Sequence, residues 1–452
     1  MGLSVIILAA GQGTRMRSDL PKVLQPLAGR PLLTHVLDCA EEAGADDIAV
    51  VYGHGGDVVR TSCNRKGLRW VLQAEQLGTG HAVQQAMPDT PDGNQVLVLF
   101  GDVPLLTAAT LERLIAATPD DAVSILSVDL DDPNGYGRIV RSDDDVTGIV
   151  EHKDASVEQR LIPEINTGVM ILPAAQLKRW LGDIGNDNVQ GEYYLTDVVA
   201  MAVQQGVAVR GIKADNWVEA MGINDKKQLA EAERALQARL VDELMTEGVG
   251  FADPARVDIR GTLACGKDVF IDVNAVFEGE VTLGDGTRIE SNNLVRDSRL
   301  GAGTIVHSNC HIEGTVTGDN CEIGPFARMR PGAELADNVK IGNFVEVKKS
   351  TIAAGSKVNH LTYIGDSEIG TGVNVGAGTI TCNYDGANKH KTTIGDNAFI
   401  GSNVSLVAPV EVGAGASIGA GSTISKPAPA NELTVARSKQ VTIKGWKKPV
   451  KK

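Results

Sequence analysis

The segment from residue 394 to residue 424 reads IGDNAF-IGSNVS-LVAPVE-VGAGAS-IGAGST-I. Every sixth residue is aliphatic, a glycine usually follows it, and a small or β-branched residue often stands three places after that glycine. A helical face repeats every 3.6 residues and a half-buried strand every two, so a period of six fits neither. The aliphatic positions are Ile394, Ile400, Leu406, Val412, Ile418 and Ile424. This pattern predicts a left-handed parallel β-helix of hexapeptide repeats, each a short strand and a turn.

The same repeat occurs earlier, at Ile323, Met329, Leu335, Ile341 and Val347. Three hexads make one coil of a triangular prism, with the aliphatic side chains inside and the small residues at the corners, and we expect coils from about residue 251 to about residue 425. The period fails between Ile380 and Ile394, where residues 381–390 intervene. A solenoid accepts insertions at its corners, and such loops often line a binding face. Scaffolds of this kind often serve acyl transfer from a thioester, which is an analogy of fold alone.

The rest of the chain divides into two regions. Residues 1–223 alternate short apolar runs with amphipathic stretches, which predicts a Rossmann-like α/β domain with a mostly parallel sheet. The runs expected to form buried strands are residues 5–8, 48–51 and 96–100. In residues 224–250, Leu229 to Leu244 show helical spacing, with Asn224 or Asp225 as the cap and glycines at the end. We interpret this segment as a linker helix, followed at residues 251–452 by the β-helix domain and a C-terminal tail.

Length and composition set the broad class. A chain of 452 residues is expected to hold two or three domains, and 42% hydrophobic with 22% charged residues is typical of a globular protein. A net charge of −14 argues against nucleic acid as a partner. The six cysteines form no CxxC pair, which favours neither a zinc site nor a disulfide framework and fits a reducing cytoplasm. The apolar stretch Val5–Ala10 is too short to span a membrane and lacks the basic lead of a signal peptide, so no membrane partner is predicted.

A glycine loop follows the first predicted strand, in the sequence LAAGQGTRM of residues 8–16. Glycine lets the backbone approach a phosphate, and its N–H groups can then face the oxygens. The third glycine of the dinucleotide motif is missing, and Arg15 and Lys22 follow the loop instead. Two cations there suit a nucleoside triphosphate whose leaving group is pyrophosphate. A tight turn with surface cations is the alternative interpretation.

An aspartate ends the third apolar strand, in the sequence FGDVP of residues 100–104. Ligands of open α/β sheets bind at the carboxyl ends of the strands. Asp102 is therefore well placed to hold Mg²⁺, which seeks oxygen ligands and bridges substrate phosphates. A lone aspartate at a strand end is more often a turn former, but the glycine loop on the first strand favours the metal.

The β-helix contains its own candidate site. Histidine titrates near neutral pH, and His360, in the sequence NHLTY of residues 359–363, is a candidate general base. Arg330 and Lys348 are 18 residues apart, one coil of three hexads, so we expect them to stack about 4.8 Å apart on one face. Two cations so close repel each other, and a shared anion such as a sugar phosphate would resolve the repulsion. We expect all three side chains to lie together; a polar turn residue is the alternative for the histidine.

Four motifs resemble those of a known family: LAAGQGTRM (residues 8–16), PKVL (21–24), QAEQLGT (73–79) and GDVPL (101–105). They look like the sugar-1-phosphate nucleotidylyltransferases. With the β-helix and its insertion, nearly the whole chain resembles the bacterial bifunctional N-acetylglucosamine-1-phosphate uridylyltransferases and glucosamine-1-phosphate acetyltransferases. The resemblance implies a cytoplasmic enzyme that makes UDP-N-acetylglucosamine for peptidoglycan and lipopolysaccharide. Acetyl-CoA first acetylates glucosamine-1-phosphate, and Mg²⁺-dependent uridylyl transfer from UTP to N-acetylglucosamine-1-phosphate then releases pyrophosphate.

For the first site, the resemblance implies a role for each matching residue. Arg15 and Lys22 act on the phosphates, and Asp102 and Asn224 hold Mg²⁺. The other substrate contacts implied are Leu8, Ala9, Ala10, Gly11, Gln73, Gly78, Thr79, Phe100 and Gly101, with Gly137, Glu151 and Asn166 on the N-acetylglucosamine. Phe100 departs from the family pattern, in which a tyrosine is expected.

For the second site, the resemblance implies His360 as the base and Arg330, Lys348, Tyr363 and Asn374 as ligands of glucosamine-1-phosphate. The acetyl-CoA contacts implied are Ala377, Asn383, Tyr384, Ser402, Ala420 and Arg437. Family members are homotrimers with this site between subunits, and the insertion helps to build it. The cysteines have no expected catalytic role, because direct attack by the amine suffices.

Two other functions stay open at this point. The β-helix could be non-catalytic and serve the assembly or regulation of an active pyrophosphorylase, although the Arg330, Lys348 and His360 constellation argues against an inert solenoid. The chain could also be a β-helical trimeriser with a degenerate nucleotide-binding domain, which the presence of Lys22 and Asp102 disfavours.

Overall fold

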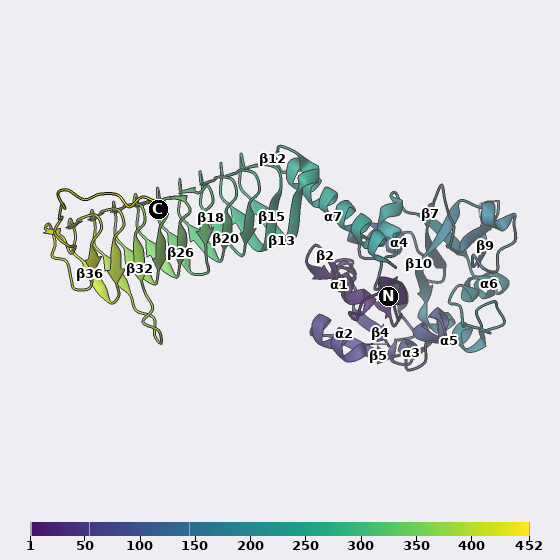
Figure 1. The fold of residues 1–452 in the computed structure, drawn as a ribbon. Coiled ribbons are helices and arrows are strands. Elements are labelled where there is room, and N and C mark those ends of the chain that lie inside the picture. Colours follow the sequence, from purple (N-terminus) through teal and green to yellow (C-terminus); the bar gives the residue numbers. More distant parts are fainter. Residues whose placement is uncertain (1, 54, 144, 452) are drawn as a thin grey trace. The chain divides into compact units, whose positions relative to one another are not determined.

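The computed structural model describes residues 2–53, 55–143 and 145–451. The chain divides into two compact units, residues 1–236 and residues 237–452. The first unit is an α/β domain and the second is a parallel β-helix (Figure 1). The predicted fold class is confirmed for both.

A mixed sheet forms the centre of the first unit, with its main strands in the order β11-β7-β10-β6-β1-β4-β5. Strands β6, β1, β4 and β5 run parallel, and β10 is antiparallel to both of its neighbours. The strands are β1 Leu3–Ala9, β4 Asp47–Tyr52, β5 Leu68–Leu72, β6 Gln95–Phe100, β7 Val123–Asp129, β8 Arg138–Ser142, β9 Asp145–Val150, β10 Glu164–Pro173 and β11 Val209–Lys213, with a separate hairpin of β2 Pro26–Leu27 and β3 Arg30–Pro31. The three strands predicted from the apolar runs are β1, β4 and β6, and their carboxyl ends meet at one edge of the sheet.

Helices cover both faces of this sheet. Helices α1, α2 and α4 pack on one face, and α3, α5 and α6 pack on the other. Their bounds are α1 Leu32–Glu42, α2 Gly56–Cys63, α3 Thr79–Ala86, α4 Ala108–Ala116, α5 Ala174–Asp183 and α6 Asp197–Gln204. Side chains of β1 alternate between the two cores, with Val5 and Ile7 in the first and Ile6 in the second. Burial on both sides explains why this strand reads as a continuous apolar run.

Helix α7 (Lys226–Thr246) begins in the first unit and ends in the second, because the boundary between the units falls inside it. Asp225 caps its start, since Oδ1 accepts hydrogen bonds from the N–H groups of Lys227 and Gln228, both at 2.9 Å. In the second unit, the Gln237 side chain exchanges two hydrogen bonds with the backbone of Ile259, at 2.7 and 2.8 Å. The predicted helix is confirmed, and those two bonds join its second half to the first coil.

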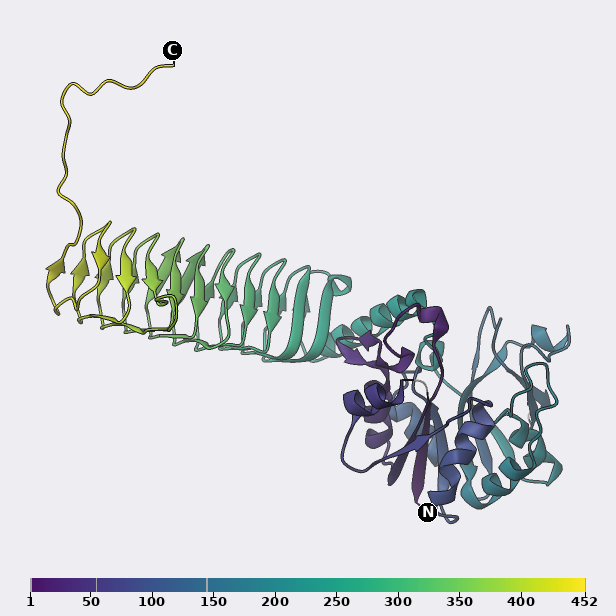
Figure 2. The ribbon, with the colours of Figure 1, turned by 60° about the horizontal axis from the view of Figure 1, so that its bottom comes forward.

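Each coil of the second unit passes through three short strands in turn (Figure 2). The first face contains β12 Gly250–Phe251, β14 Phe270–Ile271, β16 Arg288–Ile289, β19 Ile305–Val306, β22 Glu322–Ile323, β25 Lys340–Asn343, β28 Lys357–His360, β31 Asn374–Val375, β34 Phe399–Ile400, β37 Ser417–Ile418 and β39 Leu433–Thr434. The second face contains β13 Val257–Cys265, β15 Ala275–Leu283, β17 Leu294–Arg296, β20 His311–Glu313, β23 Arg328–Met329, β26 Glu346–Lys348, β29 Tyr363–Gly365, β32 Ile380–Cys382, β35 Ser405–Val407 and β38 Thr423–Ile424. The third face contains β18 Arg299–Leu300, β21 Thr315–Thr317, β24 Ala333–Leu335, β27 Ser350–Ile352, β30 Ser367–Ile369, β33 Thr392–Ile394 and β36 Val410–Val412, and the long β13 and β15 extend onto it.

The interior of the coils follows the hexad pattern. The aliphatic residues of both predicted runs are all buried in one continuous core. One column departs from the pattern just before the insertion, where Thr381 points inward with no exposed surface and Ile380 points outward with 46% exposed. The Thr381 hydroxyl is satisfied inside the coil, because it accepts a hydrogen bond from the N–H of Gly365 at 2.8 Å. The aliphatic repeat is therefore interrupted at Thr381, the inward position that follows Val375.

The β-helix continues past its predicted end near residue 425. Strand β39 pairs in parallel with β37 and adds one more strand to the first face. It lies 16 residues after β37, and the proline-containing stretch between them breaks the sixfold spacing. The chain then leaves the last coil as the C-terminal segment (Figure 2).

Candidate active sites

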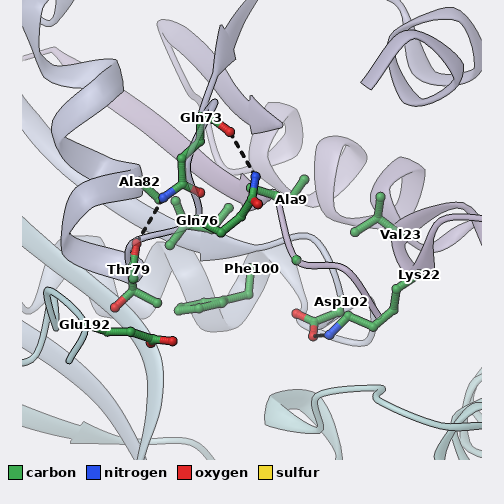
Figure 3. A pocket seen from close by; sticks show the side chains of 14 residues that line it. Ala9, Lys22, Val23, Gln73, Gln76, Thr79, Ala82, Phe100, Asp102 and Glu192 are labelled. Carbon is green, nitrogen blue, oxygen red and sulfur yellow. Dashed lines mark hydrogen bonds and ion pairs between the residues drawn. The ribbon is translucent and has the colours of Figure 1, made fainter. Parts of the chain in front are cut away.

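A pocket of about 250 Å³ lies at the carboxyl ends of β1 and β6 (Figure 3). It brings together ten residues that the sequence predicted for the first site: Leu8, Ala9, Ala10, Gly11, Lys22, Gln73, Gly78, Thr79, Phe100 and Asp102. Four further lining residues were missed by the sequence reasoning: Val23, Gln76, Ala82 and Glu192. Val23 and Gln76 stand inside quoted motifs and could have been included, whereas Glu192 comes from a distant segment that no motif marks.

The glycine loop presses on Lys22. Gly13 has a φ of +61°, in the left-handed region, and a Cβ there would lie 2.6 Å from the Cβ of Lys22. Glycine meets both demands, the positive φ and the close approach. The loop thereby holds the residue that begins the 3₁₀ turn Lys22–Leu24 against the pocket. Arg15, in the preceding turn, is exposed and does not line the pocket. Gly101 does not line the pocket either, and its backbone packs against Val23.

Lys22, Asp102 and Asn224 form the polar end of the pocket. The Lys22 ammonium pairs with the Asp102 carboxylate and donates to Oδ1 of Asn224 at 3.2 Å. In Figure 3 the side chains of Lys22 and Asp102 point at each other across the pocket mouth. They are 14% and 17% exposed. Two oxygens from distant chain segments thus converge on one cation, and a carboxylate with an amide oxygen is a donor set that suits Mg²⁺.

Gly137, Glu151 and Asn166 form a second cluster. The carbonyl of Gly137 accepts a hydrogen bond from the N–H of Asn166 at 2.9 Å. A Cβ on Gly137 would lie 3.4 Å from the Glu151 carboxylate, so the glycine brings the backbone against that side chain. The Thr196 hydroxyl donates to Oε1 of Glu151 at 3.1 Å. The three residues predicted to hold the sugar are therefore neighbours, and Thr196 is a partner that no motif marked.

The Glu151 carboxyl has a perturbed pKa. Burial raises it, and the negative charges of Asp154 and Asp197 raise it further, while the hydrogen bond from Thr196 opposes the shift. Burial likewise raises the pKa of Asp197. Carboxyls with raised pKa values in a cleft are typical of functional sites.

Phe100 and Tyr136 connect the pocket to the second cluster. The Phe100 ring lines the pocket and packs on Gly168, where a Cβ would lie 2.5 Å from the ring. Burial raises the pKa of the Tyr136 phenol, and the charge of Asp102 raises it further, so this side chain lies within reach of the polar end of the pocket. The residue that follows it, Gly137, belongs to the second cluster. The two clusters therefore form one continuous site.

In the β-helix, one edge of the prism holds a column with one residue per coil. Its members are Asn343, His360, Ala377, Ser402 and Ala420, and each of the first four carbonyls accepts a hydrogen bond from the N–H that follows the next member, at 2.7–3.3 Å. Nδ1 of His360 lies 2.7 Å from Oδ1 of Asn343. At the other end, Nη1 of Arg437 donates to the carbonyl of Ala420 at 2.6 Å. Four predicted acetyl-CoA contacts thus continue the column that begins with Asn343 and His360.

Arg330 and Lys348 stand in register at the ends of β23 and β26, on the other edge of the second face. The earlier members of their column alternate in charge: Arg260, Glu278, Arg296 and Glu313. Glu278 pairs with both of the arginines beside it. Arg330 and Lys348 continue this column as two successive cations, so the predicted stacking is confirmed and the alternation ends there.

The expectation that His360 lies beside these two cations is wrong for a single chain. Strand β29 runs from the edge of His360 to Gly365, which is in register with Lys348, so the histidine and the cations lie at opposite ends of one face. Twelve residues separate Lys348 from His360, two hexads instead of three, and the histidine therefore falls at a different corner. Asn374 likewise begins β31 on the first face, away from Arg330.

Each cation has a carboxylate partner, so the repulsion between them does not by itself require a shared anion. Nη1 of Arg330 contacts Oε1 of Glu346 at 2.8 Å, and Nζ of Lys348 lies 4.0 Å from Oδ2 of Asp366. All four side chains are partly exposed. Acidic neighbours thus balance the charge within the chain, and the shared phosphate stays a prediction.

The insertion extends this edge. The amide of Asn383 donates to Asp366 and lies 3.4 Å from the hydroxyl of Tyr363. The Lys389 ammonium lies 4.1 Å from the centre of the Tyr384 ring. A cavity of about 440 Å³ lies where the insertion meets the third face, and its lysines are Lys349, Lys389 and Lys391. Sequence reasoning gave these lysines no role, although two of them follow the Asn383–Tyr384 pair closely.

An apolar column runs beside the His360 column. Phe326, Phe344 and Leu361 follow one another along the corner and are 51%, 55% and 62% exposed. The two phenylalanine rings are stacked, with centres 5.3 Å apart. The thiols nearby are buried, and burial raises the pKa of Cys310 to about 11, which makes it a poor nucleophile.

Two family models match the chain. The MobA-like NTP transferase domain matches residues 5–139, and the bacterial transferase hexapeptide (six repeats) matches residues 314–349 and 391–426. Fold and pockets therefore define a two-domain transferase, with a nucleotidyltransferase domain followed by a hexapeptide-repeat domain. In the described part of the chain, no helix is both long enough and apolar enough to cross a membrane.

Curated relatives match over the full length. The bifunctional protein GlmU of Azoarcus sp. is 58% identical over 450 residues, which are 99% of this chain and 100% of the relative. Those of Aromatoleum aromaticum and Herminiimonas arsenicoxydans are 56% and 54% identical, and the matches cover 99% or more of this chain and 99% of each relative. A solved UDP-glucose pyrophosphorylase complexed with UDP-glucose covers 53% of this chain and 100% of its own at 17% identity, with a TM-score of 0.44, and supports no further conclusion. The chain belongs to the family of bifunctional GlmU proteins.

Proposed function

We propose that the two sites perform the two steps of UDP-N-acetylglucosamine synthesis, each on its own domain. As a member of this family the chain is a bifunctional transferase, and its first domain takes a nucleoside triphosphate. Acetyl transfer comes first, on residues 251–452, and uridylyl transfer from UTP follows, on residues 1–223, with residues 224–250 as the linker. The observation that carries the proposal is the single pocket that gathers ten expected nucleotide contacts around the Lys22–Asp102 pair. We place the enzyme in the cytoplasm, where UTP and acetyl-CoA are available.

In uridylyl transfer, the phosphate of N-acetylglucosamine-1-phosphate attacks the α-phosphate of UTP and pyrophosphate leaves. The nucleophile is already anionic, so the reaction needs no strong base. Catalysis then consists of positioning and charge neutralisation. Lys22 supplies a cation inside the pocket and Arg15 a second one from the exposed loop. Gly137, Glu151 and Asn166 hold the sugar through backbone, carboxylate and amide groups.

Asp102 and Asn224 would hold Mg²⁺, whose charge would offset the negative charge of the phosphates. The fit rests on the two oxygens that converge on the Lys22 ammonium. With the ion on these oxygens, the Lys22 ammonium would be available to the phosphates.

In acetyl transfer, His360 takes a proton from the amine of glucosamine-1-phosphate, the amine attacks the thioester carbonyl, and the proton leaves with the thiol of CoA. With Oδ1 of Asn343 as its acceptor, Nδ1 carries the proton of the neutral imidazole, so Nε2 is the nitrogen that accepts the proton of the amine. Ala377, Ser402 and Ala420 have small side chains, which leave room along the edge for the extended arm of CoA. A CoA arm bound along this column would lie beside the base.

One subunit does not bring the base and the phosphate cations together. Five residue steps lead from His360 to Gly365, a path of up to roughly 16 Å at about 3.3 Å each. The amine and the phosphate of glucosamine-1-phosphate, however, stand on adjacent carbons. We therefore assign the site to two copies of the chain, with the His360 edge of one facing the Arg330 and Lys348 edge of the next. Three copies that each give both edges close a ring with three equivalent sites.

The apolar column supports this homotrimer. Phe326, Phe344 and Leu361 are more than half exposed and lie next to His360, on the edge that would face a neighbour. Burial of stacked aromatic side chains favours such an association. The other partners are the four small molecules, glucosamine-1-phosphate, N-acetylglucosamine-1-phosphate, acetyl-CoA and UTP.

The test is incubation of the whole chain with glucosamine-1-phosphate, acetyl-CoA, UTP and Mg²⁺, with CoA, pyrophosphate and the sugar nucleotide measured separately. We expect CoA release without UTP, and pyrophosphate release only after N-acetylation. Pyrophosphate release from UTP and N-acetylglucosamine-1-phosphate, without any acetyl-CoA consumption, would leave the β-helix as a non-catalytic scaffold.

A further inference from the structure

Arg138 is fully buried beside the sugar cluster, where a charge is costly. Its side chain is 1% exposed. In the part of the chain that the structure describes, Nη1 donates to the carbonyl of Tyr136, Nη2 donates to the carbonyl of Arg160 at 3.3 Å, and Nε has no partner. Neither acceptor is a carboxylate. Burial lowers the pKa of this guanidinium and the charge of Arg160 lowers it further, while the Asp132 carboxylate opposes the shift. The buried charge is therefore costly, and Arg138 contributes little as a stabiliser.

Arg138 lies next to each residue of the sugar cluster, either along the chain or across the sheet. It follows Gly137 directly, and it pairs in register with Val150 and Ile165, the residues just before Glu151 and Asn166. Its guanidinium then reaches back to the loop that ends at Gly137 and across to the 3₁₀ turn Gln159–Leu161. One side chain therefore joins the segments that border the sugar side of the pocket.

The loop that it holds has few other anchors. Residues 131, 132, 134 and 135 are exposed. Two bonds within the loop itself shape its turns, from the N–H of Asn134 to Asp132 at 3.2 Å and from the N–H of Tyr136 to the carbonyl of Pro133 at 3.3 Å. The bond from Arg138 to the Tyr136 carbonyl fastens this loop to a buried group. Tyr136 itself lies near Asp102 on the nucleotide side and directly precedes Gly137 on the sugar side, so the bond fastens the loop where the two sides meet.

We propose that Arg138 is a positioning residue for the sugar phosphate. Its guanidinium clamps the carbonyls of Tyr136 and Arg160 and so fixes Gly137 against Glu151 and Asn166. The inference rests on the proposed uridylyl transfer. A misplacement of about 1 Å can cost about 10²-fold in rate, so loss of the clamp acts on the sugar substrate without any contact between Arg138 and that substrate.

The test compares full-length Arg138→Met and Arg138→Lys with the wild type in steady-state uridylyl transfer. Arg138→Met should raise the KM of N-acetylglucosamine-1-phosphate about 10- to 100-fold and leave the KM of UTP within about twofold. Arg138→Lys should recover part of the loss, because an ammonium can donate to one of the two carbonyls. Arg160→Met is the matched control, because it keeps the backbone carbonyl that Arg138 binds and removes only a like charge that disfavours the Arg138 guanidinium, so it should not raise the KM of the sugar.

Acetyl transfer by the same samples reports the amount of folded second domain. Amide hydrogen exchange of residues 131–137 gives a readout without turnover, and these amides should exchange faster in Arg138→Met than in Arg160→Met. An unchanged sugar KM in Arg138→Met overturns the proposal. So does an equal rise of both KM values or a loss of the fold, since either result makes Arg138 merely structural. A wild-type protein without uridylyl transfer would contradict the proposed function instead, and the exchange data would still decide the clamp.

Discussion

Arg330 and Lys348 stand in register in successive coils, as two cations at the end of a column in which charge alternates from coil to coil. An acidic residue at position 348 would continue the alternation, and a lysine stands there instead. Glu346 and Asp366 balance the surplus from neighbouring positions that are partly exposed. The phosphate proposed to bind here would replace these carboxylates, because ion pairs between partly exposed side chains are weak.

The first prediction concerns this pair. Arg330→Met and Lys348→Met should each raise the KM of glucosamine-1-phosphate about 10- to 100-fold, since a hydrogen bond to a charged group contributes about 1.5–3 kcal/mol. The KM of acetyl-CoA should stay close to wild type. Arg296→Met, in the same column but paired with Glu278, is the control and should change neither value. Initial rates of CoA release measure all three variants. An equal effect of Arg296→Met would show that the loss of any positive charge in this column weakens binding, and would contradict a specific role of Arg330 and Lys348.

Much of the β-helix could be predicted, because its repeat determines which side chains point inward. Thr317 and Thr381 are exceptions that take inward aliphatic positions, and beside Thr381 the side chain of Ile380 is turned out. A hydroxyl that bonds to the backbone of the same solenoid can fill an inward position, and a pattern of apolar residues does not detect it. The position of His360 was mispredicted because residues stack on one edge only when they are three hexads apart. His360 follows Lys348 by two hexads and therefore lies at a different corner of the prism.

In the first domain, the sequence predicted the pocket residues that stand in motifs, but not the residues that reach the site from distant segments. The strand and glycine loop place Leu8–Gly11, Lys22 and Asp102 at one edge of the sheet. Glu192 and Thr196 reach the site from a segment far along the chain, and only the folded packing brings them there. Arg138 shows the same limit, because nothing in its local sequence indicates that its guanidinium is buried on two carbonyls.

The second prediction concerns the base. His360→Ala should lower kcat of acetyl transfer about 10²- to 10⁴-fold, and Asn343→Leu about 10- to 100-fold, because the amide oxygen orients the imidazole and selects its tautomer. Uridylyl transfer measured in the same samples should not change, since that pocket belongs to the other unit. If Asn343→Leu keeps the wild-type kcat, the contact at Nδ1 has no part in catalysis.

The third prediction tests the two-copy site. His360→Ala and the double variant Arg330→Met/Lys348→Met should each be nearly inactive in acetyl transfer at low sugar phosphate. Mixed trimers, formed by co-expression of the two and isolated through both affinity tags, should regain about a third of the wild-type sites, because one of their three interfaces joins an intact histidine edge to an intact cation edge. Purified variants mixed without subunit exchange should stay inactive. Co-expressed trimers without recovery would mean that base and cations act from one chain.

The fourth prediction concerns the Asp102 carboxylate. Asp102→Asn should lower kcat of uridylyl transfer about 10²- to 10³-fold, since it removes a charge that binds Lys22 and would hold the ion. The Mg²⁺ concentration for half-maximal rate should rise. Thermal unfolding should change little, because an asparagine has nearly the same size and can still accept a hydrogen bond from Lys22, which also donates to Asn224. Pyrophosphate release over a magnesium titration measures the effect, and an unchanged magnesium dependence would contradict the role.

The fifth prediction separates stability from activity at Glu151. Burial raises the pKa of this carboxyl in the folded state, so folding favours its neutral form. The stability that this preference contributes is present below the unfolded pKa and is lost as pH rises through the folded pKa. Glu151→Gln is neutral at every pH, and the first unit of this variant should therefore unfold at a higher temperature than wild type at pH 8, with the difference shrinking toward pH 5.

The gain should amount to about 2–4 °C for each kcal/mol recovered. Uridylyl transfer should nevertheless fall, with a raised KM for N-acetylglucosamine-1-phosphate, because a glutamine lacks the charged acceptor. Thr196→Val provides the opposite control, since it removes the hydrogen bond that lowers the Glu151 pKa and should destabilise the unit most at high pH. Differential scanning calorimetry from pH 5 to pH 8 measures both. A Glu151→Gln protein that is less stable than wild type at pH 8 would show that the ionised carboxylate is well solvated or well paired, and the site would then lose its argument for a buried acceptor of the sugar.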